Sequence, residues 1–218
     1  MTSTVFVSLS MSVDGYIAPD GMTMEHADDP EYRDWMRLWS QLQSWVFPQQ
    51  AFRERLELGE GGRTGSDNDL VERTFARTGA SVMGMRMFEG GERFWPQEPP
   101  FHHPVFVLTH RVREPWIRPG TTFTFVNSDG MDAARKALAL AAEAAQGKDV
   151  RIAGGGDTVR QFLNAGLVDE ITLSIAPVVL GGGVPLFDGI DPARVGLQIA
   201  DVLASPAVTH LTYRCTAA

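Results

Sequence analysis

The chain has 218 residues, of which 44% are hydrophobic and 21% are charged, a composition typical of one folded domain with a substantial core. Its 19 Lys and Arg residues against 27 Asp and Glu residues give a formal net charge of −8, which disfavours nucleic acid or an anionic membrane as partner. The single cysteine, Cys215, excludes an internal disulfide, and the first residues lack the apolar run of a signal peptide. We therefore expect a cytoplasmic protein with no membrane partner.

The first part of the chain predicts a strand followed by a helical insertion. Residues 4–10, "TVFVSLS", are typical of a buried strand. Asp29 and Pro30 resemble an N-cap and a first helical residue, and large apolar residues then recur at helical spacing, which predicts a helix ending before Pro48. A shorter helix, "QQAFRERL", and a glycine-rich loop follow. We interpret residues 22–66 as an insertion or lid.

The rest of the chain alternates strands and helices. Ser66 and Asp69 resemble a capping box that begins a helix ending at Gly79. Strands are expected at 80–84, 105–111 and 122–128 and in "DVRIAGGG" from residue 149. A short helix at 85–94 is expected to be disrupted by Gly90 and Gly91, and further helices are expected at 131–146 and from residue 157. Three strand-like segments come after Gly166. The pattern predicts one α/β domain over residues 1–218, with a mainly parallel mixed sheet, helices on both faces and antiparallel C-terminal strands.

Three consecutive glycines, Gly154 to Gly156, stand between the strand at 149–154 and the next helix in "RIAGGGDTVRQFL". Exposed backbone N–H groups at a helix N-terminus favour an anion, and glycine lets a pyrophosphate come close. The spacing differs from the G-x-G-x-x-G of a Rossmann turn. A tight turn that needs positive φ angles is the alternative interpretation. A second triple, residues 181–183 in "VVLGGGVPLF", favours a bulge or hairpin.

Five segments carry a resemblance to a known family. They are "SLSMSVDGYIA", "VMGMRMFE", "VFVLTHR", "RIAGGGDTVRQFL" and "VDEITLSIAPVVLGGGVPLF". In this order and spacing they resemble the dihydrofolate-reductase-like superfamily, and most of all the reductase domain of bacterial riboflavin-biosynthesis deaminase/reductases and their stand-alone relatives. The resemblance covers most of the chain except residues 22–66. It implies an NADPH-dependent reductase, with NADH as a possible cofactor, that acts on a small heteroaromatic substrate as a homodimer.

The resemblance also implies which residues bind the cofactor. They are Gly84, Met85, Arg86, Thr109, His110, Arg111, Ala153, Gly154, Gly155, Gly156, Asp157 and Thr158. The glycine turn would hold the pyrophosphate. Met85 stands where the family usually has a basic residue, and Met87 where it has a hydroxyl, so Arg86 or Arg111 would have to supply the charge. The alternative for Arg111 is an ordinary surface cation.

The catalytic candidates are carboxylates. Asp14 matches the family's loop beside the nicotinamide, although an aspartate that bonds its own turn is the alternative. Asp69 and Asp67 lie near the helix that carries the active carboxylate of dihydrofolate reductases, and helix capping explains them equally well. Riboflavin-pathway reductases typically have a lysine where this chain has Tyr16. No metal site is expected.

Two other functions stay open. A non-catalytic module that keeps a nucleotide or flavin is suggested by Met85 and Met87. A true dihydrofolate reductase is the other, although such enzymes lack the long insertion. The insertion itself carries Trp35, Trp39 and Trp45, which face either a flat substrate, a second subunit or simply the core.

Overall fold

The computed structural model describes residues 3–21, 30–127 and 130–216. Within these residues lie eleven strands and six helices. The strands are β1 (Val5–Ser12), β2 (Tyr16–Ala18), β3 (Thr78–Gly84), β4 (Val105–Thr109), β5 (Trp116–Arg118), β6 (Thr121–Asn127), β7 (Asp149–Gly154), β8 (Glu170–Ala176), β9 (Val184–Pro185), β10 (Gly196–Ala204) and β11 (Thr209–Thr216). The helices are α1 (Pro30–Leu42), α2 (Gln50–Arg55), α3 (Ser66–Arg77), α4 (Met85–Glu92), α5 (Gly130–Ala144) and α6 (Gly156–Asn164).

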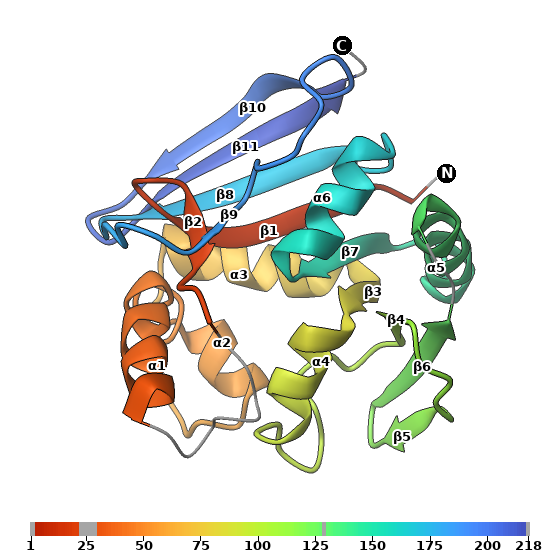
Figure 1. Cartoon of the computed structure of the whole chain (residues 1–218). Helices are drawn as coiled ribbons and strands as arrows, with labels where there is room; N and C mark the ends of the chain where they lie inside the picture. Colours follow the sequence, from red (N-terminus) through yellow and green to blue (C-terminus); the bar gives the residue numbers. More distant parts are fainter. Residues whose placement is uncertain (1–2, 22–29, 128–129, 217–218) are drawn as a thin grey trace.

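Nine strands form one sheet in the order β10-β11-β8-β1-β7-β3-β4-β6-β5. The six strands from β8 to β6 are parallel, whereas β11, β10 and β5 are antiparallel to their neighbours. In Figure 1, β1 lies in the middle of the sheet, with α6 in front of it and α3 behind it. The predicted fold class, a mainly parallel mixed sheet with helices on both faces and antiparallel C-terminal strands, is therefore confirmed.

The core has one main layer on each face of the sheet. Val7, Val82 and Ile152 point to one face, where α5 and α6 bury them. Met83, Val105 and other side chains point to the opposite face and pack against α4. Because successive side chains of a strand alternate between the faces, each central strand contributes to both layers. Among the described residues, no helix is long and apolar enough to cross a membrane.

Several element boundaries differ from those that the sequence predicts. Helix α1 ends at Leu42 and turns follow it, instead of a helix up to Pro48. The proposed N-cap of α1, Asp29, lies outside the described residues. Helix α3 begins at Ser66 itself with Gly65 as N-cap, and no side chain caps it, so the expected capping box of Ser66 and Asp69 is wrong. The glycine at the N-cap position still provides a permissive backbone there.

Helix α4 runs through Gly90 and Gly91, which were expected to disrupt it. A Cβ at Gly91 would lie 2.0 Å from Cζ2 of Trp95. Glycine is therefore needed because the indole ring packs directly on the helix backbone.

Strand β8 ends at Ala176, although the apolar run continues to Leu180. It ends there because Pro177 cannot donate a ladder hydrogen bond.

A two-stranded sheet of β2 and β9 lies beside the main sheet and was not predicted. The second glycine triple leads into β9. Gly183 has a φ of +141°, and a Cβ there would lie 2.2 Å from the backbone oxygen of Ala18. A structural role was predicted for this triple, as a bulge or hairpin. Gly183 has such a role, because it lets the backbone before β9 approach the backbone of β2, a distant segment of the chain.

Replacing Gly183 with alanine should therefore destabilise the protein, whereas Gly182→Ala is the matched control. A methyl group at Gly182 meets no atom within 4 Å. We expect Gly183→Ala to cost about 2 kcal/mol or more of unfolding free energy and Gly182→Ala to change it by no more than about 0.5 kcal/mol. Urea unfolding of both variants measures this. Equal stabilities would show that the approach of β9 to β2 is loose.

His103 generates a second prediction. Its Nε2 lies 2.8 Å from Oγ of the buried Ser81 on β3, and burial lowers the pKa of His103 to about 3 from 6.5, with Arg55 and Arg151 as further contributors. The unfolded chain therefore binds this proton at a higher pH than the folded protein does. The contribution of His103 to stability should be constant above pH 6.5 and should fall as the pH drops from 6.5 towards 3.

His103→Gln should remove about one proton, or about 1.4 kcal/mol per pH unit, from the slope of stability against pH in that window. Unfolding by urea at several pH values provides the slope, and His102→Gln, at the exposed neighbouring position, is the control. A variant slope equal to that of the unmodified protein would contradict the assignment.

Candidate functional site

The carboxyl ends of the parallel strands meet at one edge of the sheet, which is where open α/β folds bind ligands. The turns after β1, β3, β4 and β7 all lie there, so the structure brings the predicted cofactor residues together. Gly84 and Thr158 are close, since a Cβ at Gly84 would lie 2.5 Å from Thr158 Oγ1. The end of β7 also contacts α4, because a Cβ at Gly154 would lie 3.2 Å from Sδ of Met87.

The three glycines of the turn differ in what the fold requires of them. Gly154 has a φ of +127°, which favours glycine, and its peptide bond to Gly155 is cis. A Cβ at Gly156 would lie 2.8 Å from Cγ1 of Val184. Gly155, the N-cap of α6, has a φ of −68° and no atom within 4 Å of where a Cβ would be. The fold explains the first and third glycines, whereas the open space beside the second is what an approaching ligand needs.

Arginines surround this turn. The Arg86 side chain is 90% exposed, and its Nη1 lies 3.6 Å from Oδ2 of Asp157. Arg160 donates to the other oxygen of Asp157 over 2.5 Å. Arg111 is 80% exposed, with its Nη1 3.5 Å from Oε1 of Glu89. Because exposed ion pairs of this kind are weak, both Arg86 and Arg111 are available to a bound anion.

Three of the other residues predicted to bind the cofactor pack against, or bond to, the protein itself. Met85 packs against the apolar cluster of α4, and Ala153 is buried in the same cluster. The Thr109 hydroxyl accepts a hydrogen bond from the Arg111 backbone N–H over 3.0 Å, which fixes the turn after β4. His110 is exposed on that turn. Met85 thus contributes core packing at a position where a basic side chain would contribute charge.

Asp14 connects two loops. Its carboxylate accepts hydrogen bonds from the backbone N–H groups of Leu180 (3.1 Å) and Gly181 (2.7 Å). A hydrogen bond from the Ser12 side chain and these two N–H groups lower the pKa of Asp14 below 3.8. Asp14 is therefore an anion at neutral pH. It holds the turn after β1 against the glycine loop that precedes β9.

The two aspartates of α3 point in different directions. Asp67 faces the sheet, where its Oδ2 accepts a hydrogen bond from Ser205 Oγ (2.9 Å) and its Oδ1 lies 3.3 Å from His210 Nε2. Asp69 is exposed to solvent, as expected for a residue about 200° further round the helix. Of the two, only Asp67 is in contact with the sheet.

His210 continues this polar network into the sheet. Its Nδ1 lies 2.8 Å from Ser174 Oγ, and both residues are buried. Burial lowers the pKa of His210, while its hydrogen bond to the Asp67 carboxylate opposes the shift. A neutral His210 can donate to Asp67 and accept from Ser174, so every side chain in the network has a partner.

The segment at 30–66 packs on the same face of the sheet. Trp45 Nε1 donates to Ser10 Oγ over 2.9 Å, and Ser10 in turn donates to Gln43 Oε1. The Trp45 ring lies edge-on to His210, with 4.7 Å between the ring centres. Trp35 is also buried and donates to the Pro19 carbonyl. Of the three alternatives for the tryptophans, Trp35 and Trp45 therefore fit packing in the core.

Arg151 is a residue of this region that the sequence reasoning missed. It lies in the middle of β7, and its Nη2 donates to the Ser8 carbonyl over 3.2 Å. Burial lowers its pKa to about 10. The available signal was an arginine inside an otherwise apolar strand, "VRIAG", because arginine is seldom buried without a partner.

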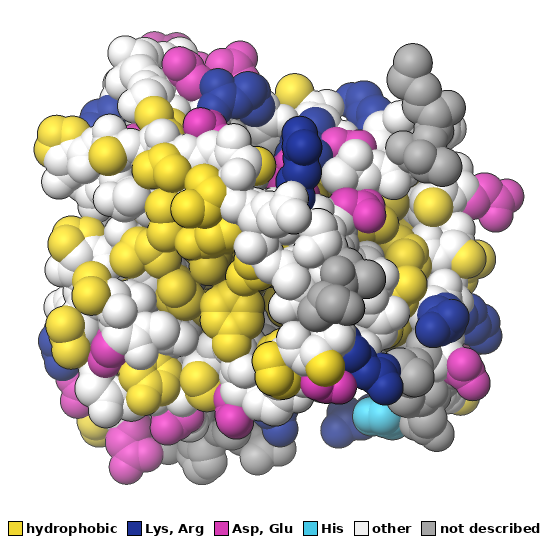
Figure 2. Space-filling view, turned by 90° about the horizontal axis from the view of Figure 1, so that it is seen from above, with side chains coloured by type: hydrophobic (Ala, Val, Ile, Leu, Met, Phe, Trp, Pro, Cys, Tyr) yellow, Lys and Arg dark blue, Asp and Glu magenta, His cyan; other side chains and the backbone are white. Residues whose placement is uncertain are grey.

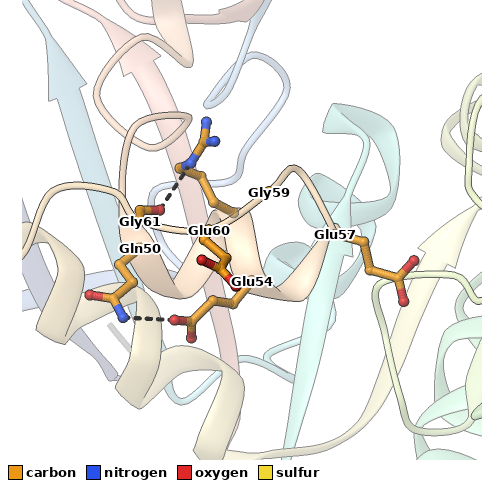
Figure 3. A pocket seen from close by; sticks show the side chains of 7 residues that line it. Gln50, Glu54, Glu57, Gly59, Glu60 and Gly61 are labelled. Carbon is orange, nitrogen blue, oxygen red and sulfur yellow. Dashed lines mark hydrogen bonds between the residues drawn. The ribbon is translucent and has the colours of Figure 1, made fainter.

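A shallow depression elsewhere on the surface is formed by α2 and the loop after it (Figure 3). Its lining residues are Gln50, Arg53, Glu54, Glu57, Gly59, Glu60 and Gly61. Gln50 donates to Glu54 over 2.7 Å, and Arg53 donates to the Gly61 carbonyl. None of these residues belongs to the strand ends described above, so this depression is separate from the candidate cofactor site.

Comparison with curated proteins and solved structures places the chain among known folds. A solved structure of a putative riboflavin biosynthesis protein from Shewanella sp. PV-4 matches with a TM-score of 0.64 and 22% identity, over 98% of this chain and 99% of that one. Dihydrofolate reductase from Enterococcus faecalis, complexed with NADP(H), matches with a TM-score of 0.54 and 14% identity, over 99% and 98%. The fold is therefore that of dihydrofolate reductase.

Other relatives share only part of their length with the chain. A diaminohydroxyphosphoribosylaminopyrimidine deaminase/5-amino-6-(5-phosphoribosylamino)uracil reductase from Thermotoga maritima matches with a TM-score of 0.56 and 13% identity, over 99% of this chain and 57% of that one. Two uncharacterized Bacillus subtilis proteins are similar in sequence. YyaP is 43% identical over 68 residues and YwjB is 34% identical over 64 residues. The matches cover 36% and 34% of those proteins and 31% and 29% of this chain.

The family model of the RibD C-terminal domain matches residues 3–211. Since this match includes nearly all of the chain, the protein belongs to the RibD C-terminal domain family.

Proposed function

We propose that the protein is an NAD(P)H-dependent reductase that transfers a hydride to a small heteroaromatic substrate, pyrimidine- or pterin-like. The observation that carries the proposal is the unfilled space beside Gly155, at the N-terminus of α6 and at the carboxyl edge of the sheet. A helix of nine residues begins there, and its first N–H groups have no partner within the helix. Backbone donors and the helix dipole together favour a diphosphate.

The surrounding residues fit such a cofactor. Arg86 and Arg111 offer two exposed guanidinium groups, which suit phosphate oxygens. Asp157 in the first turn of α6 is an unfavourable charge, and its two oxygens face Arg160 and Arg86. The relatives support the same reading, since the Thermotoga protein is a reductase and the Enterococcus one was solved with NADP(H).

In this proposal, the cofactor supplies the hydride, and the protein provides orientation and a surface that excludes water. The backbone N–H groups of the glycine turn hold the diphosphate. Asp14, which is already ionised, fixes the turn after β1 instead of delivering a proton. Asp67 is the carboxylate of α3 that contacts the sheet, and so it is our preferred group for holding a proton. We expect a substrate other than that of the riboflavin-pathway reductases, because Tyr16 stands where those enzymes typically have a lysine.

A non-catalytic module is the second candidate. Met85 and Met87 give the site less charge and fewer hydroxyl groups than relatives have, and both pack in the apolar cluster of α4. Such a module would bind NADPH and never consume it. Oxidation of NADPH in the presence of pterin and ribosylaminopyrimidine compounds distinguishes it from the reductase. A true dihydrofolate reductase would instead turn over dihydrofolate.

The diphosphate site is tested by replacing Gly155 with aspartate. We expect Gly155→Asp to weaken NADPH binding by about 100-fold, because the carboxylate repels the diphosphate in a partly desolvated place. Gly155→Asn has the same size without the charge, and is the matched control. Tryptophan fluorescence titration measures both. The site would be rejected if aspartate and asparagine had the same effect or if the unmodified protein bound neither NADPH nor NADH.

The expected homodimer is also a proposal, and the exposed face of β10 supports it. Leu197, Ile199 and Val202 are exposed on this nine-residue edge strand. A register shift between Ile199 and Asp201 puts Ile199 opposite Tyr213 and Val202 opposite Leu211, so that these side chains share one face of the sheet. Seen from above β10, hydrophobic side chains gather in one area of the surface (Figure 2). Unpaired edges and apolar patches of this kind favour a second copy.

Ile199→Glu should therefore convert the protein to a monomer in sedimentation experiments. Ile117→Glu is the control, because Ile117 is exposed to a similar extent, 76% against 70%, on β5 at the opposite edge of the sheet. A charge in an apolar interface is strongly unfavourable. A dimer that persists in the first variant and dissociates in the second would place the interface at β5.

A further inference from the structure

Arg160 belongs to the second turn of α6, and its side chain reaches back to the glycine turn. The Arg160 side chain is only 18% exposed, whereas that of Asp157, three residues earlier, is 77% exposed. A Cβ at Gly156 would lie 3.2 Å from Arg160 Nη1, so the guanidinium lies beside the backbone at the helix N-terminus. A largely buried cation therefore stands next to the place proposed for the diphosphate.

Both terminal nitrogens of this guanidinium have a partner. Nη2 donates to Oδ1 of Asp157 over 2.5 Å, and Nη1 donates to the carbonyl of Pro185 in β9. An ordinary i,i+3 pair on a helix surface contributes little, because both side chains stay in water. Here the second hydrogen bond, to a segment 25 residues away, fixes the guanidinium. The charge of Arg160 is therefore held at Asp157.

Asp157 has a second cationic neighbour, which is held differently. Nη1 of Arg86 lies 3.6 Å from Asp157 Oδ2, and the Arg86 side chain is 90% exposed. This distance is longer than a hydrogen bond, and an exposed ion pair of this kind is weak. Arg86 can therefore leave Asp157 at little cost, whereas Arg160 would lose two hydrogen bonds by turning to solvent.

The carboxylate of Asp157 opposes the binding of an anion at this helix end. Asp157 lies in the first turn of α6, where the backbone N–H groups and the helix dipole favour negative charge. A side-chain carboxylate and a diphosphate compete for the same donors and repel each other. Any guanidinium that Asp157 holds is also lost to the phosphate oxygens. The site therefore needs one cation for Asp157 and another for the ligand.

We propose that Arg160 is a positioning residue of the diphosphate site, which neutralises Asp157 so that Arg86 is released to the phosphate oxygens. The inference rests on the proposed function, because that function supplies the diphosphate. Arg160 acts through Asp157, since its Nη1 and Nη2 are bound within the protein. The alternative is a purely structural role in holding β9 against α6, because Val184 of β9 also lies against Gly156.

A double-mutant cycle separates the two roles, with inorganic pyrophosphate and NADPH titrated separately by calorimetry. We expect Arg160→Gln to weaken pyrophosphate binding by about tenfold. In the Asp157→Asn background, the same substitution should change the affinity by less than about twofold, because no carboxylate is left to neutralise. Asp157→Asn alone should bind pyrophosphate more tightly than the unmodified protein does.

Arg194→Gln is the matched control. Arg194 forms an i,i+3 pair with Asp191 and bonds the Asn164 carbonyl at the other end of α6. This variant should bind pyrophosphate like the unmodified protein. Arg160→Lys keeps the charge on a single nitrogen and should lose less affinity than Arg160→Gln. If Arg160→Gln does not fold, the cycle is completed with Arg160→Lys, and the same dependence on Asp157 is expected.

An equal loss of pyrophosphate affinity in both backgrounds would show that Arg160 only holds β9, and would overturn the proposal. The absence of pyrophosphate binding by the unmodified protein would overturn it as well. If pyrophosphate shows the expected coupling but NADPH does not bind, the proposed function is rejected and the role of Arg160 stands. If NADPH binds and is consumed without this coupling, the reductase stands and the role of Arg160 is rejected.

Discussion

The parallel pairing of β1 with both β7 and β8 is the constraint on which the rest of the structure depends. The first strand of the chain lies between two strands from its last third, so the centre of the sheet forms only when distant segments meet. Two carboxylates secure the start of β1, since Asp149 accepts from the Thr4 N–H and Asp169 accepts from the Val5 N–H. The start of β1 is therefore closed, and its far end is where β7 separates from it.

This separation explains why the functional candidates gather at one edge. Turns that follow parallel strands lie on the same side, and glycine allows the chain to turn closely there. At Gly154 and Gly156 the reason for glycine is backbone conformation or contact with Val184, so these two would be required in a protein with no ligand. Gly155 has neither reason. The space beside Gly155 is open to an approaching ligand.

The sequence predicted the order of strands and helices because periodicity and glycine or proline breaks are local signals. The resemblance to the reductase family, and not these local signals, implied that residues 84–86, 109–111 and 153–158 bind one cofactor. The sequence could not predict the pairing of β2 with β9 or the direction of Asp67, because both depend on contacts between segments far apart in the chain. Capping at Ser66 failed for a different reason: Gly65 offers an N-cap conformation that a local motif does not reveal. The roles of Asp14 and Asp69 stay predictions.

The face of the sheet that α3 covers contains two kinds of polar group, which differ in how fully they are hydrogen-bonded. In the first, Ser10, Ser174, His210, Asp67 and Trp45 satisfy one another, and this completed network attaches the insertion to the sheet. Removing one partner would leave the others buried without a bond, at a cost of about 1–3 kcal/mol each. The second kind is Arg151, which has a donor left over and a charge without a counterion. Because the side chains of the first network bond one another, that network holds the segment at 30–66 against the sheet.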